Sequence, residues 1–291
     1  MKVLITGGSG FVARNLYESI KNEHEVSCFS RKELDLLDAD KVYQCLKKNR
    51  FEVVVHTATY DAVAKFSTKD PTKVLECNLR MYFNLLRGRA YFSKMIYFGS
   101  GAEFNRQDWI AGMGEDYYDC HVPNDQYGFS KYLMTKNALS EEKIYNLRLF
   151  GMFGKYDDWR TRLIPNVCYL AIMGMKVTIE QNKYYDFLDI ADLVRIIKWF
   201  FINNPKEKVF NVCTGRVTDY KTIAEKIIKI SGKKLDLVIK NEGLGKEYSG
   251  DNSLLMKQLG DFKFCDFDKS LKTLYDWYDK NKNDIFIDKK R

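Results

Sequence analysis

Hydrophobic and polar positions change their spacing repeatedly along the first half of the chain. Short β-branched or apolar runs predict strands, and the segments between them carry apolar residues at helical spacing. The predicted strands are 2–6, 25–29, 53–56, 95–98 and 145–150, and the predicted helices are 11–22, 39–48, 72–87 and 125–143. Strands that alternate with helices in this way indicate βαβ units, so we predict an α/β fold with a doubly wound parallel sheet.

The spacing becomes less regular after about residue 150. Helices are predicted at 164–173, 190–202, 220–231 and 268–280, and strands at 209–213 and 235–240. No linker rich in glycine, serine or proline divides the chain. We therefore predict a first domain over residues 1–163 and a smaller α/β lobe over residues 164–291, with segments near 186–215 interleaving with the first domain. A ligand site is expected in the cleft between them.

Composition places the chain among globular proteins. Its 291 residues are 45% hydrophobic and 30% charged, which excludes a disordered chain, a collagen-like repeat and a small disulfide scaffold. The apolar runs are shorter than the ~20 residues of a membrane span. Glycines follow the N-terminal run too soon for a signal peptide. We expect a cytoplasmic protein with no membrane partner.

Net charge and the placement of cysteines and histidines limit the ligands that the protein can be expected to bind. The formal net charge of +8 favours an anionic partner, which could be nucleic acid, a membrane surface or a phosphorylated small molecule. No aromatic and basic cluster of the RNA-binding type is present, so we expect no nucleic-acid partner. The seven cysteines are scattered without a CxxC pair and the three histidines are isolated. Neither a disulfide framework nor a metal site is predicted.

A glycine-rich segment, TGGSGFVA (residues 6–13), links the first predicted strand to the first helix. Gly7 permits a tight turn, Gly10 lets the backbone approach a pyrophosphate, and Ala13 allows close packing of helix on strand. The helix N-terminus then offers N–H groups to phosphate oxygens. Because strand, loop and helix occur in the required order, we predict a dinucleotide-binding domain of the Rossmann type.

The end of the second predicted strand bears on the choice of cofactor. An NAD-specific site usually has an acidic residue there, whereas an arginine suits the 2′-phosphate of NADP. The sequence at this point is Phe29-Ser30-Arg31-Lys32, and Glu33 lies beyond the basic pair. We predict NADP (as NADPH), with Arg31 on the phosphate and Arg14 as a second contact. The alternative is that the basic pair is only a solvated turn.

A tyrosine four residues before a lysine can form a proton-transfer pair on one helix face. The ammonium favours phenolate and should lower the pKa of the tyrosine. The spacing occurs at Tyr17/Lys21, Tyr43/Lys47, Tyr127/Lys131, Tyr132/Lys136 and Tyr278/Lys282. Only Tyr127, in YGFSK, lies near the start of the helix after strand 95–98, which Gly99, Ser100 and Gly101 follow. The carboxyl end of that strand is where an open α/β sheet binds its ligand, so we select Ser100, Tyr127 and Lys131.

Together these motifs resemble the extended short-chain dehydrogenase/reductases that modify nucleotide sugars. The likeness is carried by TGGSGFVA, VVVHTAT, YFGSGAEF, YGFSK, LRLFGMFG, YDFLDIADLV and FNVCTG, which span most of the chain. Within that family the stretch SRKELDLLD is most similar to the GDP-fucose synthases and related 4-keto-sugar reductases. The resemblance implies a Rossmann-type domain with a smaller substrate-binding lobe. It also implies a homodimer formed through helices 72–87 and 125–143.

The resemblance assigns roles to individual positions. It implies that Ser100, Tyr127 and Lys131 are catalytic. The implied cofactor-binding residues are Thr6, Gly7, Ser9, Gly10, Phe11, Val12, Arg31, Asp35, Leu36, Thr57, Ala58, Tyr127, Lys131 and Phe150. The implied substrate-binding residues are Ser100, Gly101, Ala102, Gly151, Lys155, Arg162 and Tyr185.

Some positions depart from the family pattern. Where epimerising relatives have a cysteine and a histidine, this chain has Ala102 and, by ungapped alignment, Ile172. Gly101 and Ala102 stand where dehydratases carry Asp-Glu. The arginine that often binds the substrate diphosphate is replaced by Tyr185. The basic residues that could replace it are Lys155, Arg160, Arg162, Lys183 and Arg216.

These departures predict a reductase. We expect NADPH-dependent reduction of the C4 keto group of a nucleotide-linked 4-keto-6-deoxy sugar, with GDP as the expected nucleotide and without C3/C5 epimerase activity. The enzyme would act after a separate epimerase or on a substrate that needs none. The alternatives are a nucleotide-sugar C4 epimerase with bound NAD and a non-catalytic NADP-sensing protein.

Overall fold

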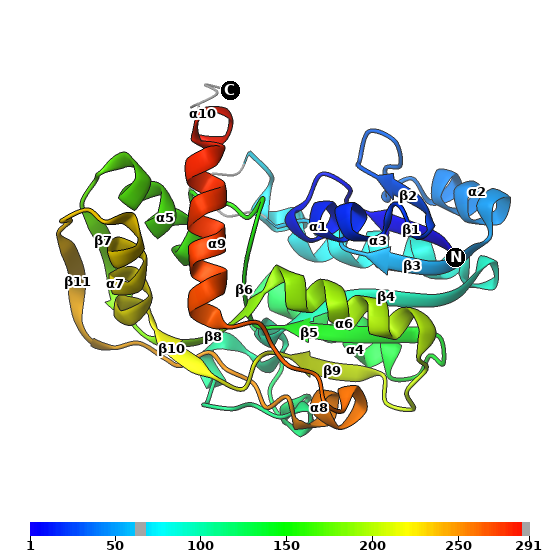
Figure 1. The fold of residues 1–291 in the computed structure, drawn as a ribbon. Coiled ribbons are helices and arrows are strands. Elements are labelled where there is room, and N and C mark those ends of the chain that lie inside the picture. The colour runs from blue at the N-terminus through cyan, green and yellow to red at the C-terminus, as the bar shows by residue number, and fades with distance from the viewer. Residues whose placement is uncertain (62–67, 287–291) are drawn as a thin grey trace.

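A six-stranded parallel sheet forms the centre of the molecule (Figure 1). The computed structural model describes residues 1–61 and 68–286. The strand order is β2-β1-β3-β4-β5-β9, and every neighbouring pair is parallel. The strands are β1 (Lys2–Thr6), β2 (Glu25–Phe29), β3 (Phe51–His56), β4 (Phe92–Ser100), β5 (Ile144–Leu149) and β9 (Val209–Val212). The predicted α/β fold class is therefore confirmed.

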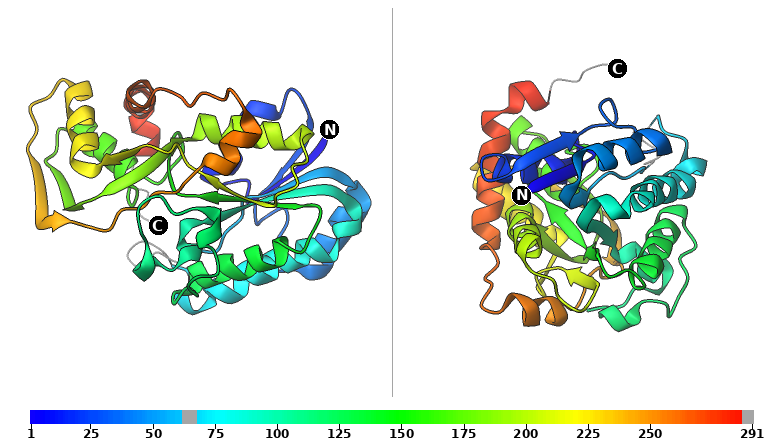
Figure 2. Two further views of the ribbon diagram at one scale, coloured as in Figure 1. Left: turned by 90° about the horizontal axis from the view of Figure 1, so that it is seen from below. Right: turned by 90° about the vertical axis from the view of Figure 1, so that its right-hand side faces the viewer.

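Helices cover both faces of this sheet, as Figure 2 shows. On one face lie α2 (Ala39–Asn49), α3 (Val74–Arg87) and α4 (Gln126–Ala138), and on the other α1 (Phe11–Ile20) and α6 (Ile190–Ile202). Successive strand residues point to opposite faces. Val3 and Ile5 accordingly join the core beneath α1 and α6, whereas Leu4 joins the core beneath α2 and α3. Both faces are apolar, which is why these strands read as continuous hydrophobic runs.

A second, smaller group of elements packs beside the sheet. It contains the helices α5 (Leu163–Met173), α7 (Tyr220–Ser231) and α9 (Phe267–Lys280) and the paired strands β7 (Val177–Asn182) and β11 (Leu237–Leu244). Their apolar side chains form a separate core. Helix α9 stands between α5 and α7 on one side and α1 on the other (Figure 1). The division of the chain at residues 163 and 164 stays a prediction.

Several elements were not predicted. They are β6 (Gly151–Phe153), β7, β8 (Tyr184–Asp189), β10 (Val217–Asp219) and the helices α8 (Ser253–Leu259) and α10 (Lys282–Ile285). The strands β6 and β10 have three residues each and form by pairing with β8, so little of their stability is local. Helix α4 ends at Ala138 instead of residue 143, and the Ser140 hydroxyl donates to the Asn137 carbonyl beyond its end. None of the helices that the structure describes is long and apolar enough to cross a membrane.

A fully buried ion pair lies under the carboxyl end of β4. Arg148 Nε donates to Glu103 Oε2 at 2.9 Å, and neither side chain is exposed. Glu103 also accepts hydrogen bonds from the Ser100 backbone N–H and the Thr135 hydroxyl. Arg148 Nη1 donates to the Asn211 side chain at 3.0 Å. One carboxylate thus connects β4, α4 and β5, and its guanidinium partner extends the connection to β9.

The first prediction concerns this pair. Replacing Arg148→Met leaves Glu103 as a buried carboxylate without its cation, which should lower the free energy of unfolding by about 3–5 kcal/mol. The double variant Arg148→Met/Glu103→Gln removes both charges and keeps a hydrogen-bond acceptor for Ser100 and Thr135. It should therefore be more stable than Arg148→Met alone when unfolding is followed in urea. A single variant as stable as the wild type would show that the pair contributes nothing.

Candidate active site

The glycine loop between β1 and α1 has the geometry of a phosphate cradle. Gly7 has a φ of +70°, and a Cβ added to it would lie 2.8 Å from Ala58 Cα, so only glycine fits. The loop closes on itself through a hydrogen bond from Gly10 N–H to the Gly7 carbonyl at 2.8 Å. Gly10 caps α1 without a side chain, which leaves the first helix N–H groups available to an anion.

Residues at the end of β3 and just after it hold this loop in place. The Thr57 hydroxyl donates to the Thr6 carbonyl at 2.6 Å, and Thr6 Oγ1 lies 2.9 Å from His56 Nδ1. Burial lowers the pKa of His56 to about 3, with Lys131 acting in the same direction, so this histidine is neutral and structural. Thr6, Gly7, Thr57 and Ala58 are therefore adjacent, and this cradle fits a dinucleotide. Of the remaining predicted loop residues, Ser9 is exposed and Phe11 and Val12 begin the helix.

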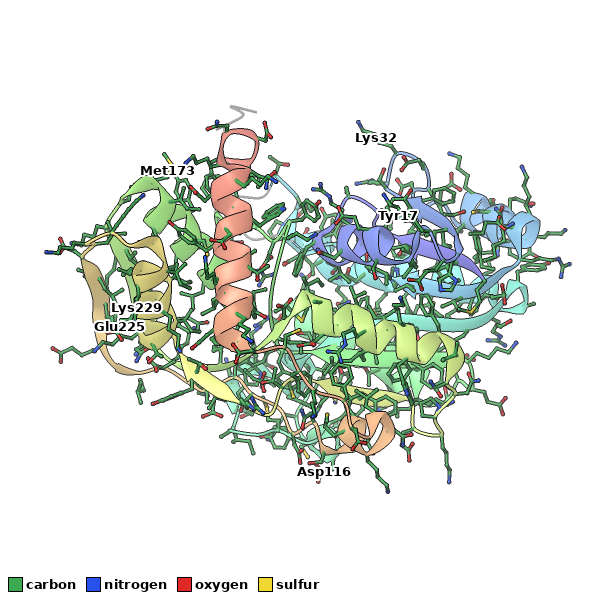
Figure 3. All side chains as sticks on the ribbon, viewed as in Figure 1. Tyr17, Lys32, Asp116, Met173, Glu225 and Lys229 are labelled. Atoms are coloured by element: carbon green, nitrogen blue, oxygen red, sulfur yellow. The ribbon has the colours of Figure 1, made fainter. Side chains whose placement is uncertain are left out.

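At the end of β2 the charges are mixed. Arg31 Nε lies 3.2 Å from Asp35 Oδ2, and the Arg31 side chain is 70% exposed. Glu33 accepts hydrogen bonds from the Ser30 backbone and hydroxyl, which lower its pKa. Lys32 extends outward from the loop that follows β2 (Figure 3). Arg31 is thus an exposed side chain paired with Asp35, Leu36 is buried, and a contact of Arg31 with the cofactor stays a prediction.

Arg14 is placed differently from Arg31. Its guanidinium carbon lies 3.5 Å from the centroid of the Tyr156 ring. The Tyr156 hydroxyl in turn donates to Glu18. Arg14 is therefore held against the outer side of α1, and a contact with the cofactor phosphate stays a prediction.

Ser100, Tyr127 and Lys131 meet at the carboxyl end of β4. Lys131 Nζ donates to the Phe98 carbonyl at 2.8 Å and lies 5.8 Å from the centroid of the Tyr127 ring. Tyr127 stands in the first turn of α4, whose N-terminus is capped by Asp125. The Ser100 hydroxyl is near enough to that of Tyr127 to influence its pKa. The structure thus brings together the three side chains selected from the sequence.

Burial governs the protonation of this group. It raises the pKa of Tyr127 to about 12, helped by the nearby Asp61 and opposed by Arg162, Arg106 and the Ser100 hydroxyl. We expected Lys131 to lower the pKa of Tyr127. The structure indicates a raised pKa instead, because desolvation and Asp61 outweigh the nearby cations. Tyr127 is therefore a protonated donor at neutral pH.

Lys131 is desolvated as well. Burial lowers the pKa of Lys131 to about 8, with Glu103 and Asp61 opposing the shift. It is therefore mostly cationic at neutral pH.

An aromatic wall continues from Ser100 into the second group of elements. Tyr248 stacks on Trp109 with 4.1 Å between ring centroids, and its ring centroid lies 5.1 Å from those of Phe150 and Tyr185. Tyr185 in turn contacts Tyr220. Phe150 was predicted for the cofactor and Tyr185 for the substrate, and the structure places both on this wall.

The remaining predicted substrate residues are spread more widely. Gly101 and Ala102 follow Ser100 in a buried 3₁₀ turn. A Cβ at Gly151 would lie 2.4 Å from the Asp186 carbonyl, so Gly151 serves close backbone packing. Arg162 is the N-cap of α5, and its charge lowers the pKa of Tyr127. Gly101, Ala102 and Arg162 thus lie near Ser100 or Tyr127, and a substrate contact for Gly151 stays a prediction.

Lys155 lies elsewhere. It pairs with Glu18 at 3.2 Å and lines a groove of about 860 Å³ between α1, α6 and α9. The glycine loop, Ser100 and Tyr127 do not line this groove. A role for Lys155 at the substrate stays a prediction.

The comparisons with known proteins agree with this geometry. The sequence model of the NAD dependent epimerase/dehydratase family matches residues 3–213. The chain belongs to this family. Its relatives include the GDP-L-colitose synthase of Yersinia pseudotuberculosis, with 25% identity over 97% of this chain and 99% of that protein. The GDP-6-deoxy-D-talose 4-dehydrogenase of Aggregatibacter actinomycetemcomitans is 23% identical over 94% of this chain and 97% of that protein.

Solved structures of family members share the fold. A GDP-L-fucose synthetase from Naegleria fowleri bound to NADP superposes with a TM-score of 0.82 at 20% identity, over 97% of this chain and 95% of that one. A GDP-mannoheptose C4 reductase from Campylobacter jejuni with NADP bound superposes with a TM-score of 0.81 at 20% identity, over 95% of this chain and 98% of that one. The chain therefore has the same fold as these enzymes.

Sequence reasoning missed several residues of the site. Glu103 was overlooked because an acidic residue is expected at the surface, and Asp61 because no motif contains it. Tyr248 and Trp109 come from loops far apart in the sequence. One signal was available for Glu103: it follows Ser100 at the spacing of a capping box, which the structure forms. Within residues 1–61 and 68–286, no group of three or more His, Cys, Asp or Glu side chains could hold a metal ion.

A second prediction follows from the buried lysines. Burial lowers the pKa of both Lys131 and Lys94 to about 8. Each loses its proton as the pH rises through that value, whereas an ordinary lysine does so near ~10.4. In ¹⁵N-lysine NMR we expect two resonances to titrate near pH 8, one missing in Lys131→Met and the other in Lys94→Met. A Lys131 resonance that stays cationic to pH 10 would contradict the account of its desolvation.

Proposed function

We propose that this enzyme reduces the C4 keto group of a GDP-linked 4-keto-6-deoxy sugar with NADPH. The observation that carries the proposal is the meeting of Ser100, Tyr127 and Lys131 at the end of β4, beside the dinucleotide cradle. A phenol with a pKa of about 12 holds its proton until an alkoxide forms next to it. Such a donor suits reduction of a ketone, which needs a proton at the carbonyl oxygen.

Each residue then has a definite role. Tyr127 donates its proton to the developing alkoxide, and the Ser100 hydroxyl donates a hydrogen bond to the same oxygen. Lys131, held by the Phe98 carbonyl, keeps a positive charge near that oxygen and can bind the cofactor ribose. When bound, the nicotinamide supplies the hydride. The cradle of Gly7 and Gly10 and the N-terminus of α1 would hold its pyrophosphate.

The two positions at which epimerising relatives carry acid–base residues hold Ala102 and Ile172 in this chain. Ala102 has no ionisable side chain and is buried. Ile172 lies in the core around α5. Cys213 is near the wall, but its thiol donates to the Gly250 carbonyl and burial raises its pKa well above the usual value. These features support a reductase without C3/C5 epimerase activity, acting after a separate epimerase or on a substrate that needs none.

The substrate diphosphate has candidate cations in this region. Lys183 Nζ lies 5.3 Å from the Tyr185 ring centroid and 5.4 Å from that of Tyr220. The charge of Arg162 lowers the pKa of both Tyr127 and Tyr220, so it lies within electrostatic reach of the two ends of the site. Lys183 and Arg162 could therefore replace the arginine that Tyr185 displaces. The GDP-linked names of several relatives support GDP as the nucleotide.

The remaining parts of the proposal concern location and assembly. Helices α3 and α4 pack together on one face of the sheet, and Phe83 on α3 is 45% exposed. We expect a cytoplasmic homodimer formed through this pair of helices.

One observation favours the C4 epimerase alternative. Glu33 places a carboxylate at the end of β2, where NAD-binding enzymes hold the ribose hydroxyls. An epimerase would retain its NAD through purification and catalyse reaction without added cofactor. A protein that is inactive until NADPH is supplied would count against it.

The third prediction tests the role of Tyr127. Tyr127→Phe removes the proton donor and should lower kcat about 10²- to 10⁴-fold on a GDP-4-keto-6-deoxy sugar. NADPH affinity should change little because the ring is kept. Tyr132→Phe is the matched control, since the Tyr132 hydroxyl bonds to Asp119 on the outer side of α4. Wild-type turnover in Tyr127→Phe would exclude this mechanism.

The fourth prediction tests the cofactor. Arg31→Ala should raise the KM for NADPH about 10- to 100-fold, the size of one charge-assisted hydrogen bond, and leave the KM for NADH unchanged. Lys32→Ala, at the neighbouring exposed position, should have a smaller effect. Equal changes for both cofactors, or a wild type that prefers NADH, would show that Arg31 does not read the 2′-phosphate.

A further inference from the structure

Tyr248 reaches the catalytic centre from the second half of the chain. Its backbone N–H donates to the Tyr184 carbonyl at 3.0 Å, and its carbonyl accepts from Asp186 N–H at 3.1 Å. Two residues later, Gly250 forms a bridge with Met113. The segment is thus fixed on both sides, by β8 and by the loop after β4.

The Tyr248 ring is equally constrained. It stacks on Trp109, whose indole N–H donates to the Gly101 carbonyl at 2.9 Å. On its other side it packs against Phe150. A Cβ at Gly101 would lie 2.6 Å from a carbon of the Tyr248 ring, so the ring can approach only because residue 101 is glycine. Because these contacts fix the Tyr248 ring, they also fix the position of its hydroxyl group.

That hydroxyl lies beside the proton-transfer group. The Tyr248 oxygen is 3.5 Å from Ser100 Oγ and 3.4 Å from the Leu149 carbonyl oxygen. Both distances are long, because hydrogen bonds between hydroxyl and carbonyl oxygens usually measure about 2.7–2.8 Å. A buried phenol normally has a better partner. The hydroxyl therefore keeps the capacity to donate to a ligand oxygen bound next to Ser100.

The raised pKa of Tyr248 is consistent with its hydroxyl acting as a hydrogen-bond donor. Burial raises the pKa of Tyr248, and a charge on Tyr127 would raise it further, so the two phenols lie within electrostatic reach of each other. Tyr248 stays protonated throughout the range in which the enzyme would work. Three hydroxyl groups, from β4, α4 and the segment after β11, therefore surround the end of β4.

We propose that Tyr248 is a specificity-determining residue that donates a hydrogen bond to the sugar, at an oxygen next to the carbon served by Ser100 and Tyr127. The inference rests on the proposed function, because it assumes a nucleotide-linked sugar at this site. Tyr127 delivers the proton to the reacting oxygen. Tyr248 favours the binding of sugars that carry an oxygen on the neighbouring carbon. The aromatic faces of Trp109 and Tyr248 limit the substituents that fit beside it.

The test separates sugar binding from nucleotide binding. Kd values for GDP-α-D-mannose and for GDP are measured by calorimetry in saturating NADP⁺, with UDP-glucose and UDP as a second pair. In Tyr248→Phe we expect Kd for the sugar-bearing ligand to rise about three- to tenfold, the effect of one neutral hydrogen bond, and Kd for the free nucleotide to stay unchanged. Gly101→Ala, which displaces the ring, should reproduce this pattern independently.

Tyr278→Phe is the matched control. Tyr278 is also a fully buried tyrosine of the second half, and its hydroxyl donates to the Asp157 carbonyl at 2.9 Å. It should change neither Kd. Equal losses for sugar nucleotide and free nucleotide in Tyr248→Phe, or no loss at all, would overturn the assignment of Tyr248 and leave the proposed function intact. A wild type that binds neither pair of ligands would overturn the proposed function and this inference with it.

Discussion

The buried carboxylate of Glu103 is the constraint on which the site depends. It accepts hydrogen bonds from Ser100 N–H, from the Thr135 hydroxyl and from Arg148, which ties the end of β4 to α4 and β5. Tyr127 and Lys131 stand on that same helix, so one group fixes the relative positions of the three side chains proposed to be catalytic. A buried charge of this kind is tolerable because it has a cationic partner and further hydrogen-bond donors. Precise placement of the site is therefore coupled to the stability of the central sheet.

A second set of contacts joins the centre to the later part of the chain. The segment of residues 246–251 lies between β8 and the loop after β4. It places the Tyr248 hydroxyl oxygen 3.5 Å from Ser100 Oγ. Backbone hydrogen bonds to β8 and aromatic stacking on Trp109 hold this contact. The Rossmann half would then supply the proton and the cofactor site, while the second half would supply discrimination between sugars. Substitutions in the second half could then change the preference for the sugar while Ser100, Tyr127 and Lys131 stay the same.

The sequence predicted the parts of the fold that depend on local pattern. The strands of the first half are continuous apolar runs, and the glycine loop needs a positive φ at Gly7, so both are visible in the residues themselves. The three-residue strands β6 and β10 exist through pairing with β8, which local spacing does not reveal. The choice of Ser100, Tyr127 and Lys131 needed only strand order and helix phase. The raised pKa of Tyr127 could not be predicted, because it arises from burial and from Asp61, and the contact of Tyr248 with Ser100 depends on tertiary packing.

The most direct test of the central claim is the fate of hydrogen in the reaction. A GDP-4-keto-6-deoxy sugar is incubated with the enzyme and unlabelled NADPH in deuterated water, beside a control without protein, and the product is examined by NMR. The account predicts a C4 alcohol with ordinary hydrogen on C4, delivered from the cofactor, and no enzyme-dependent deuterium at C3 or C5. Deuterium on C4, or enzyme-dependent deuterium at C3 or C5, would contradict it.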